Sequence, residues 1–236
     1  TLPPGVVAAS GFDVLCHALE SYTALPFNQR SPRPPRPLER PAYQGANPIS
    51  DVWSLHALDL VSKWLPVAYD DPSNDEARGH VMLAASFAGI GFGNAGVHLC
   101  HGMSYPVSSL VRDYIPEGYA RTPLIPHGMS VVLHAPAVFR FTAEANPERH
   151  LHAAKVMGAD TSKAKDSDAG NILVEQVLKL MKKMKVPNGL SAVGYSESDI
   201  PNLVKGTLPQ HRVTKLSPRP VGEEELAKLF RESLKI

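Results

Sequence analysis

The sequence has little cysteine, almost no net charge and no long apolar run. Two cysteines among 236 residues cannot build a disulfide framework, which excludes a small disulfide-stabilised scaffold and fits a reducing compartment. A formal net charge of +1 leaves no basic excess to neutralise nucleic-acid phosphates, which argues against nucleic-acid binding. No apolar run reaches the roughly 18–20 residues of a membrane span, so we expect no membrane partner.

Proline, by contrast, is plentiful, with 22 residues, and many of them fall in one segment. The prolines of residues 24–47 break every helical period, so we expect a Pro/Arg-rich loop insertion there. Two interpretations of this loop stay open: a solvated, mobile insertion, which its composition favours, or a surface that binds an acidic partner. Its arginines are Arg30, Arg33, Arg36 and Arg40.

Apolar residues recur at helical spacing along most of the chain. We expect helices at about residues 11–23, 50–65, 75–95, from 98 onward, 127–142, 148–157, 167–183, 197–205 and 222–233. Ser10 would cap the first helix, Pro66 would follow the end of the second, and Pro136 would kink or split the helix that starts at residue 127. With no strand pattern, the predicted fold class is all-α, with residues 1–236 forming one helical metal-binding domain.

The first expected helix carries a carboxylate and an imidazole four residues apart, at Asp13 and His17. This spacing puts both side chains on one helical face, as two ligands of a divalent metal ion would be. Imidazoles brought in by the fold would complete such a site, and the candidates are His101 and His127. One carboxylate and three imidazoles suit Fe(II) or Zn(II) better than Mg(II) or Ca(II), which prefer oxygen ligands.

Simpler interpretations of these residues remain open. An Asp and a His four residues apart occur by chance in many helices, and a His that follows a Pro, as His127 does, often only starts a helix. His98 lies three residues before His101 and could coordinate in its place. The glycines of residues 89–93 resemble a dinucleotide-binding loop, but they follow a helical run rather than a strand, so we predict no cofactor-binding residues in this chain.

A series of short motifs, in order along the chain, resembles one protein family. They are Thr1-Leu2-Pro3-Pro4, Gly11-Phe12-Asp13, His17-Ala18-Leu19-Glu20-Ser21-Tyr22, Asn47-Pro48-Ile49-Ser50-Asp51, Ala84-Ala85-Ser86-Phe87-Ala88-Gly89, Gly93-Asn94-Ala95-Gly96, His101-Gly102-Met103-Ser104-Tyr105-Pro106 and Pro126-His127-Gly128. On these motifs the chain is similar to the C-terminal, all-helical domain of the iron-containing (group III) alcohol dehydrogenases, which have a dehydroquinate synthase-like fold. The resemblance is closest over residues 1–160.

The resemblance implies a ligand set, a cofactor and a missing neighbour. It carries the metal ligands to Asp13, His17, His101 and His127, around Fe(II) or Zn(II). In the family an α/β domain with a glycine-rich dinucleotide loop comes first and binds most of the NAD. We expect that domain to be absent from this chain, and the chain alone to be inactive. One departure is Tyr105, which stands where the family usually has a further His, and the gap from His101 to His127 is also longer than in bacterial members.

Within the family, three segments resemble a mitochondrial branch that acts as a transhydrogenase. They are the Pro/Arg-rich insertion, residues 98–108 and residues 205–210. This resemblance implies hydride transfer from 4-hydroxybutyrate to 2-oxoglutarate through bound NAD, giving succinate semialdehyde and 2-hydroxyglutarate, and it implies a mitochondrial location, although no transit peptide is seen. Because both substrates carry carboxylates, we expect a cation near the site. The candidates for substrate contact are His98, Tyr105, Arg112 and Arg121.

Three other functions stay open on the sequence. The chain could belong to an ordinary NAD-dependent alcohol dehydrogenase of the same family that releases its cofactor at each turnover. It could instead be a catalytically incomplete helical piece that acts in oligomerisation, and a homo-oligomer is expected to be possible in either case. A zinc hydrolase is disfavoured, because the sequence contains no general-base motif such as His-Glu-x-x-His.

Overall fold

The computed structural model describes residues 2–30, 34–119 and 121–236, and this part of the chain is helical. Thr1 of the first motif and Arg33 of the insertion lie outside it. The only β pairing among the described residues is an isolated bridge between Pro26 and Ala46. The prediction of an all-α fold is therefore confirmed. The main helices are α1 (Pro4–Thr23), α2 (Pro48–Asp70), α3 (Asp75–Ala95), α4 (Leu99–Ser109), α5 (His127–Val132), α6 (Ala135–Ala143), α7 (Pro147–Val156), α8 (Ala169–Lys183), α9 (Ile200–Thr207), α10 (His211–Thr214) and α11 (Glu223–Ser233).

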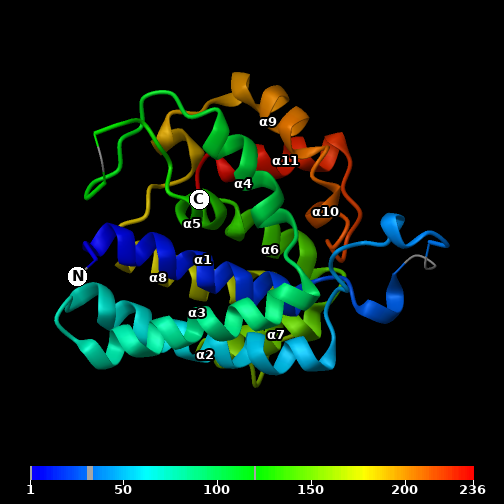
Figure 1. Cartoon of the computed structure of the whole chain (residues 1–236), viewed down its shortest axis with the longest axis horizontal. Coiled ribbons are helices and arrows are strands. Elements are labelled where there is room, and N and C mark those ends of the chain that lie inside the picture. Colours follow the sequence, from blue (N-terminus) through cyan, green and yellow to red (C-terminus); the bar gives the residue numbers. More distant parts are fainter. Residues whose placement is uncertain (1, 31–33, 120) are drawn as a thin grey trace.

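Helix α1 is the central element of the fold. It crosses the middle of the molecule, with α2 and α3 on one side and α4, α5, α9, α10 and α11 on the other (Figure 1). Phe12, Leu15 and Leu19 of α1 are fully buried, and they belong to one continuous apolar core that extends from α2 to α11. Burial of so many apolar side chains on one helix makes α1 a firmly held support for the side chains that it presents.

Helices α2 and α3 form an antiparallel pair that packs along α1. Asn47 and Asn74 cap the two helices, since each side-chain oxygen accepts a hydrogen bond from a backbone N–H of the first turn. No single helix among the described residues has the length and hydropathy of a membrane span. Helices α3 and α4 satisfy those criteria only as a pair, and they are bent by 104° at the break between them.

Two of the expected helix ends differ from the structure. The first helix begins at Pro4, so Ser10 lies inside α1 and caps nothing; proline has a φ angle suited to the first turn of a helix, which allows this earlier start. The second helix continues past Pro66 to Asp70, because packing against α1 and α3 outweighs the hydrogen bond that a proline removes. As predicted, the helical segment that starts at residue 127 is split near Pro136, into α5 and α6.

In the insertion at residues 24–47, the described residues form no helix longer than the short 3-10 turns Phe27–Gln29 and Pro37–Glu39. Its two ends are joined to the helical body, because Leu25 donates to the carbonyl of Leu216 and Gly45 donates to that of Ala95. Arg30 donates to the carbonyl of Tyr43, so this arginine links the loop to itself. The insertion is thus anchored at its base, beside the start of α4 and the region of α10.

Candidate metal centre

Asp13 and His17 lie one turn apart on α1, as their spacing predicts. The Asp13 Oδ1 and His17 Nδ1 atoms are 3.7 Å apart. The imidazole of His17 is stacked on the ring of Phe92 from α3, with centroids 4.0 Å apart and planes 12° apart. Neighbouring α3 therefore fixes the orientation of His17, which lies beside Asp13 and has its ring centroid 4.5 Å from that of His101 in α4.

His101 and His127 reach the same Asp13 oxygen from two other helices. His101 stands in the first turns of α4, and its Nε2 lies 3.3 Å from Asp13 Oδ1. His127 is the first residue of α5, and its Nε2 lies 3.6 Å from the same oxygen. Gly128 permits this approach, because a Cβ there would stand 1.8 Å from the carbonyl oxygen of Ala9 in α1. The structure thus brings together all four residues predicted as ligands.

The distances within this cluster fit ligands of one cation better than they fit hydrogen bonds. Two atoms bound about 2.1 Å from one ion in tetrahedral geometry stand roughly 3.4 Å apart. The three distances to Asp13 Oδ1 span 3.3–3.7 Å, beyond a good N–H···O bond. Asp13 Oδ1 and His101 Nε2 are buried and have no hydrogen-bond partner. One ligand atom from each of Asp13, His17 and His101 lies within 4.8 Å of the others. His127 joins these three residues by its contact with Asp13, whose Oδ1 lies 3.6 Å from His127 Nε2.

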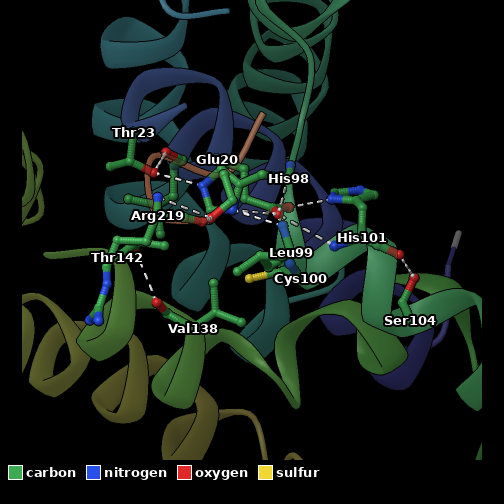
Figure 2. Close-up of polar contacts among 12 residues, drawn as sticks. Glu20, Thr23, His98, Leu99, Cys100, His101, Ser104, Val138, Thr142 and Arg219 are labelled. Carbon is green, nitrogen blue, oxygen red and sulfur yellow. Dashed lines mark hydrogen bonds and ion pairs between the residues drawn. The ribbon is translucent and has the colours of Figure 1, made fainter. Parts of the chain in front are cut away.

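A second carboxylate, Glu20, lies behind His101 and is fully buried (Figure 2). Its Oε1 accepts hydrogen bonds from the backbone N–H groups of His98 and Cys100, at 3.0 and 2.8 Å. Its Oε2 accepts from Nδ1 of His101. A carboxylate that accepts a hydrogen bond from the Nδ1–H of a histidine keeps the proton on Nδ1, leaves Nε2 free as a metal ligand and fixes the orientation of the ring. Glu20 therefore directs Nε2 of His101 toward Asp13.

The charges of the cluster favour a cation. Burial raises the pKa of Glu20, but the contacts with His101 and His98 outweigh burial and lower the pKa to about 2. Burial lowers the pKa of His101, but Glu20 and Asp13 outweigh it and raise the pKa to about 10. Burial and the neighbouring His101 lower the pKa of His17 to about 4, so this imidazole is neutral near pH 7 and can offer a nitrogen lone pair to a metal ion. A metal ion bound to Nε2 of His101 in place of a proton would be stabilised by the same two carboxylates, Glu20 and Asp13.

The four candidates for substrate contact lie in different surroundings. His98 is fully buried: its Nδ1 accepts from the N–H of Leu99 at 2.8 Å and its Nε2 lies 3.1 Å from Thr23 Oγ1. With no exposed surface, His98 shapes the start of α4 rather than touching a substrate, which corrects that expectation. Tyr105 is half-buried, and its ring lies parallel to that of His127, with centroids 6.5 Å apart.

The two arginines predicted from the sequence to contact the substrate, Arg112 and Arg121, form no pair with the candidate metal ligands. The Arg112 guanidinium donates to both carboxylate oxygens of Asp199, at 2.7 and 3.1 Å, and to the carbonyl of Gly194. Its charge is therefore already paired. Arg121 is exposed in the loop that joins α4 to α5. Among the described residues, neither arginine has a hydrogen bond or an ion pair with Tyr105 or with any of the four candidate ligands.

Glu20 is the residue of this site to which sequence reasoning assigned no role. A signal for it exists: Glu20 lies seven residues after Asp13 and three after His17, so all three share one face of α1. An acidic residue at that spacing, in a helix made mostly of apolar residues, indicates a buried charge that needs partners. The partners themselves come from α4, more than seventy positions away, which no local pattern reveals.

Comparison with known proteins places the chain in one family of dehydrogenases. Residues 39–234 match the model of the Fe-containing alcohol dehydrogenase family, C-terminal. Over its whole length the chain is 63% identical to "Probable hydroxyacid-oxoacid transhydrogenase, mitochondrial" of Dictyostelium discoideum, of which it covers 44%. It is 60% identical to "Hydroxyacid-oxoacid transhydrogenase, mitochondrial" of Homo sapiens, of which it covers 50%. The chain thus spans about half the length of the curated relatives it matches.

Solved structures with the same fold support this placement. A crystal structure of 1,3-propanediol oxidoreductase superimposes with a TM-score of 0.81 at 27% identity, over 98% of this chain and 52% of the other. The alcohol dehydrogenase from Oenococcus oeni gives a TM-score of 0.82 at 24% identity, again over 98% of this chain and 52% of the other. The second likeness shows the fold alone. In both, the chain corresponds to about half of a longer protein.

Proposed function

Because the chain belongs to the iron-containing alcohol dehydrogenase family, we propose that it is the metal-binding half of a mitochondrial hydroxyacid-oxoacid transhydrogenase. Identity near 60% with proteins of that name, over the whole chain, supports this choice. The observation that carries the proposal is the convergence of three imidazoles on Oδ1 of the Asp13 carboxylate, where two buried atoms have no hydrogen-bond partner.

Asp13, His17, His101 and His127 would hold the metal, Fe(II) or Zn(II), since both accept this donor set. A divalent cation bound there supplies Lewis-acid polarisation of the substrate's alcohol or carbonyl oxygen. The chain's own residues do the positioning: Glu20 keeps Nε2 of His101 available, and Phe92 holds the ring of His17 in place. His127 and Tyr105 stand on the open side, where a substrate can enter.

The overall reaction would transfer one hydride from the hydroxy acid to the oxo acid through NAD. 4-Hydroxybutyrate would be oxidised to succinate semialdehyde by loss of a hydride and a proton, and 2-oxoglutarate would be reduced to 2-hydroxyglutarate by gain of a hydride and a proton, with bound NAD supplying the hydride-carrying chemistry. The described residues contain no glycine-rich loop between a strand and a helix, so a neighbouring α/β domain would bind most of the cofactor. The names of the relatives support a mitochondrial site of action.

The test uses the purified full-length enzyme without added NAD. Incubation with 4-hydroxybutyrate and 2-oxoglutarate should give equal amounts of succinate semialdehyde and 2-hydroxyglutarate over many turnovers. Product formation that stops after one equivalent per enzyme, and resumes only with free NAD⁺, would instead support an ordinary NAD-dependent alcohol dehydrogenase. The likeness to 1,3-propanediol oxidoreductase favours that second candidate. No turnover by metal-loaded enzyme under either condition would contradict both.

A further inference from the structure

Both substrates of the proposed function carry carboxylates, so a cation is expected near the site. Arg212 is the candidate that the structure offers. This residue belongs to α10, which packs on α4 directly beside His101. A Cβ on Gly102 would lie 2.9 Å from the Thr214 methyl and 3.4 Å from a methyl of Val213, so the two helices are in close contact there. Arg212 is exposed, and its guanidinium lies 5.6 Å from the centre of the Tyr43 ring in the anchored insertion.

Tyr105 connects Arg212 to the metal cluster. Burial raises the pKa of Tyr105, whereas a hydrogen-bonding contact with the Arg212 guanidinium lowers it. On its other side, the Tyr105 ring is parallel to the imidazole of His127, at 3°. Arg212 is therefore about one tyrosine side chain away from a metal ligand, on the side where His127 and Tyr105 have exposed surface.

The charge of Arg212 is not already used. Within the part of the chain that the structure describes, no Asp or Glu oxygen lies within 4.0 Å of its guanidinium nitrogens, whereas Arg112, Arg149, Arg219 and Arg231 each have a carboxylate partner. A guanidinium offers two parallel N–H donors that match a carboxylate. Arg212 thus has both the free charge and the geometry that Arg112 lacks.

The two substrates of the proposed function share one feature that suits a fixed cation. In 4-hydroxybutyrate, two methylene groups separate the carbinol carbon from the carboxylate. In 2-oxoglutarate, two methylene groups separate the carbonyl carbon from the distal carboxylate. With the reacting oxygen held at the metal ligands, both substrates place a carboxylate at the same reach, so one arginine can serve both half-reactions.

Resting on the proposed function, we propose that Arg212, flanked by Tyr105 and Tyr43, binds the carboxylate that lies two methylenes from the reacting carbon in both the hydroxy acid and the oxo acid. This residue is then a specificity determinant: it selects ω-hydroxy and 2-oxo acids with that spacing over neutral alcohols. Tyr105 supports the guanidinium on the side of the metal, and Tyr43 supports it on the side of the insertion.

The experiment compares Arg212→Gln with Arg112→Gln in the full-length, metal-loaded enzyme. Reduction of bound NAD⁺ is followed with 4-hydroxybutyrate and with 1-butanol, which has the same chain length and no charge, and 2-oxoglutarate binding is followed by calorimetry. Loss of a charge-assisted hydrogen-bonding pair should raise the KM for 4-hydroxybutyrate and the Kd for 2-oxoglutarate by about 10-fold or more. The rate with 1-butanol should stay within about 2-fold, and Arg112→Gln should change none of the three.

Two results overturn the assignment. One is an Arg212→Gln enzyme that keeps wild-type constants for both acids; the other is one that loses 1-butanol oxidation as severely as that of 4-hydroxybutyrate. Arg212→Lys keeps the charge without the planar fork, so intermediate constants for the acids should accompany it even if the Gln variant folds poorly. If the wild-type enzyme oxidises 1-butanol but accepts neither acid, the proposed function fails as well, which distinguishes the two failures.

Discussion

His101 and His127 make the same approach to one oxygen of Asp13 from opposite surroundings. Both stand near the start of a short helix, but the side chain of His101 is 3% exposed and that of His127 is 49% exposed. Behind His101 lies the buried carboxylate of Glu20; beside His127 lie Tyr105 and, beyond it, Arg212. On the proposed function, this difference would separate the two tasks of the site: the buried half would fix ligand geometry, and the exposed half would receive the substrate.

Replacing the two histidines tests that division most directly. His101→Ala should lower metal affinity by about 100-fold or more, since it removes a ligand and leaves the Glu20 carboxylate buried without its partner. His127→Ala should lower it less, because water can replace an exposed ligand. Metal content by elemental analysis, with helicity by circular dichroism, measures both. Equal losses in the two variants would contradict the comparison.

Glu20→Gln should weaken metal binding by about 10- to 100-fold. The glutamine oxygen can still accept from the backbone of α4, but its NH₂ would then face Nδ1 of His101, which favours the tautomer with its proton on Nε2. Metal titration and ¹⁵N NMR of the His101 ring report the two effects. The matched control is Glu76→Gln, which changes an exposed Glu–His pair with His80 on α3 and should leave metal affinity unchanged. Normal affinity and tautomer in Glu20→Gln would remove its positioning role.

Gly128→Ala tests how the exposed half is held against α1. The added Cβ would meet the Ala9 carbonyl, so α5 must shift, and we expect a loss of about 2 kcal/mol in the free energy of unfolding together with weaker metal binding. The control is Gly79→Ala in α3, where a Cβ meets nothing within 4 Å and should stabilise the helix by about 0.5–1 kcal/mol. Urea unfolding measures both variants, and a neutral Gly128→Ala would show that α5 is not fixed by this contact.

The smallest expected effect concerns an imidazole remote from the metal ligands. His134 is fully buried, neither of its ring nitrogens has a hydrogen-bond partner, and burial lowers its pKa to about 3. Because the unfolded chain binds this proton near pH 6.5, the stability that the neutral ring allows is complete above pH 6.5 and falls as pH drops toward 3. His134→Leu should remove that loss.

Unfolding in urea at pH 5.5 and 7.5 measures the His134 effect. At pH 5.5 the leucine variant should gain about 1 kcal/mol relative to the wild-type protein, after subtraction of the difference at pH 7.5. His56→Leu, at an exposed position of α2, provides the control and should show no such pH-dependent gain. An unchanged acid slope in His134→Leu would mean that this ring is not held neutral in the fold.

The comparison also shows what the sequence could predict. The pairing of Asp13 with His17 follows from helical spacing alone, and the split at Pro136 follows from the chemistry of proline. The convergence of His101 and His127 on Asp13 is predicted only through motifs that resemble a family, because no local pattern links positions 88 and 114 residues apart. The prediction that Ser10 caps the first helix is wrong, because a serine can also lie inside a helix whose start is set by a proline.

The choice between Arg112 and Arg212 shows what the sequence alone does not predict. Arg112 and Arg212 have the same chemistry, and nothing in their flanking residues tells which one is paired. That depends on which carboxylate packs beside each: Asp199 neutralises Arg112, whereas α10 places Arg212 against α4 and Tyr105. Long-range packing of this kind is decided by the whole core, so it becomes visible only in the folded chain.

Helix α1 places Asp13, His17 and Glu20 on one face within two turns, while its other faces are locked in the core. Inserting or deleting one residue inside this helix would turn everything downstream by about 100° relative to everything upstream. Such an event would misdirect all three groups simultaneously and could not be repaired by substitution at any single position. Length changes in descendants of this gene should therefore collect in the insertion at residues 24–47 and in the turn at residues 71–74, and leave α1 intact.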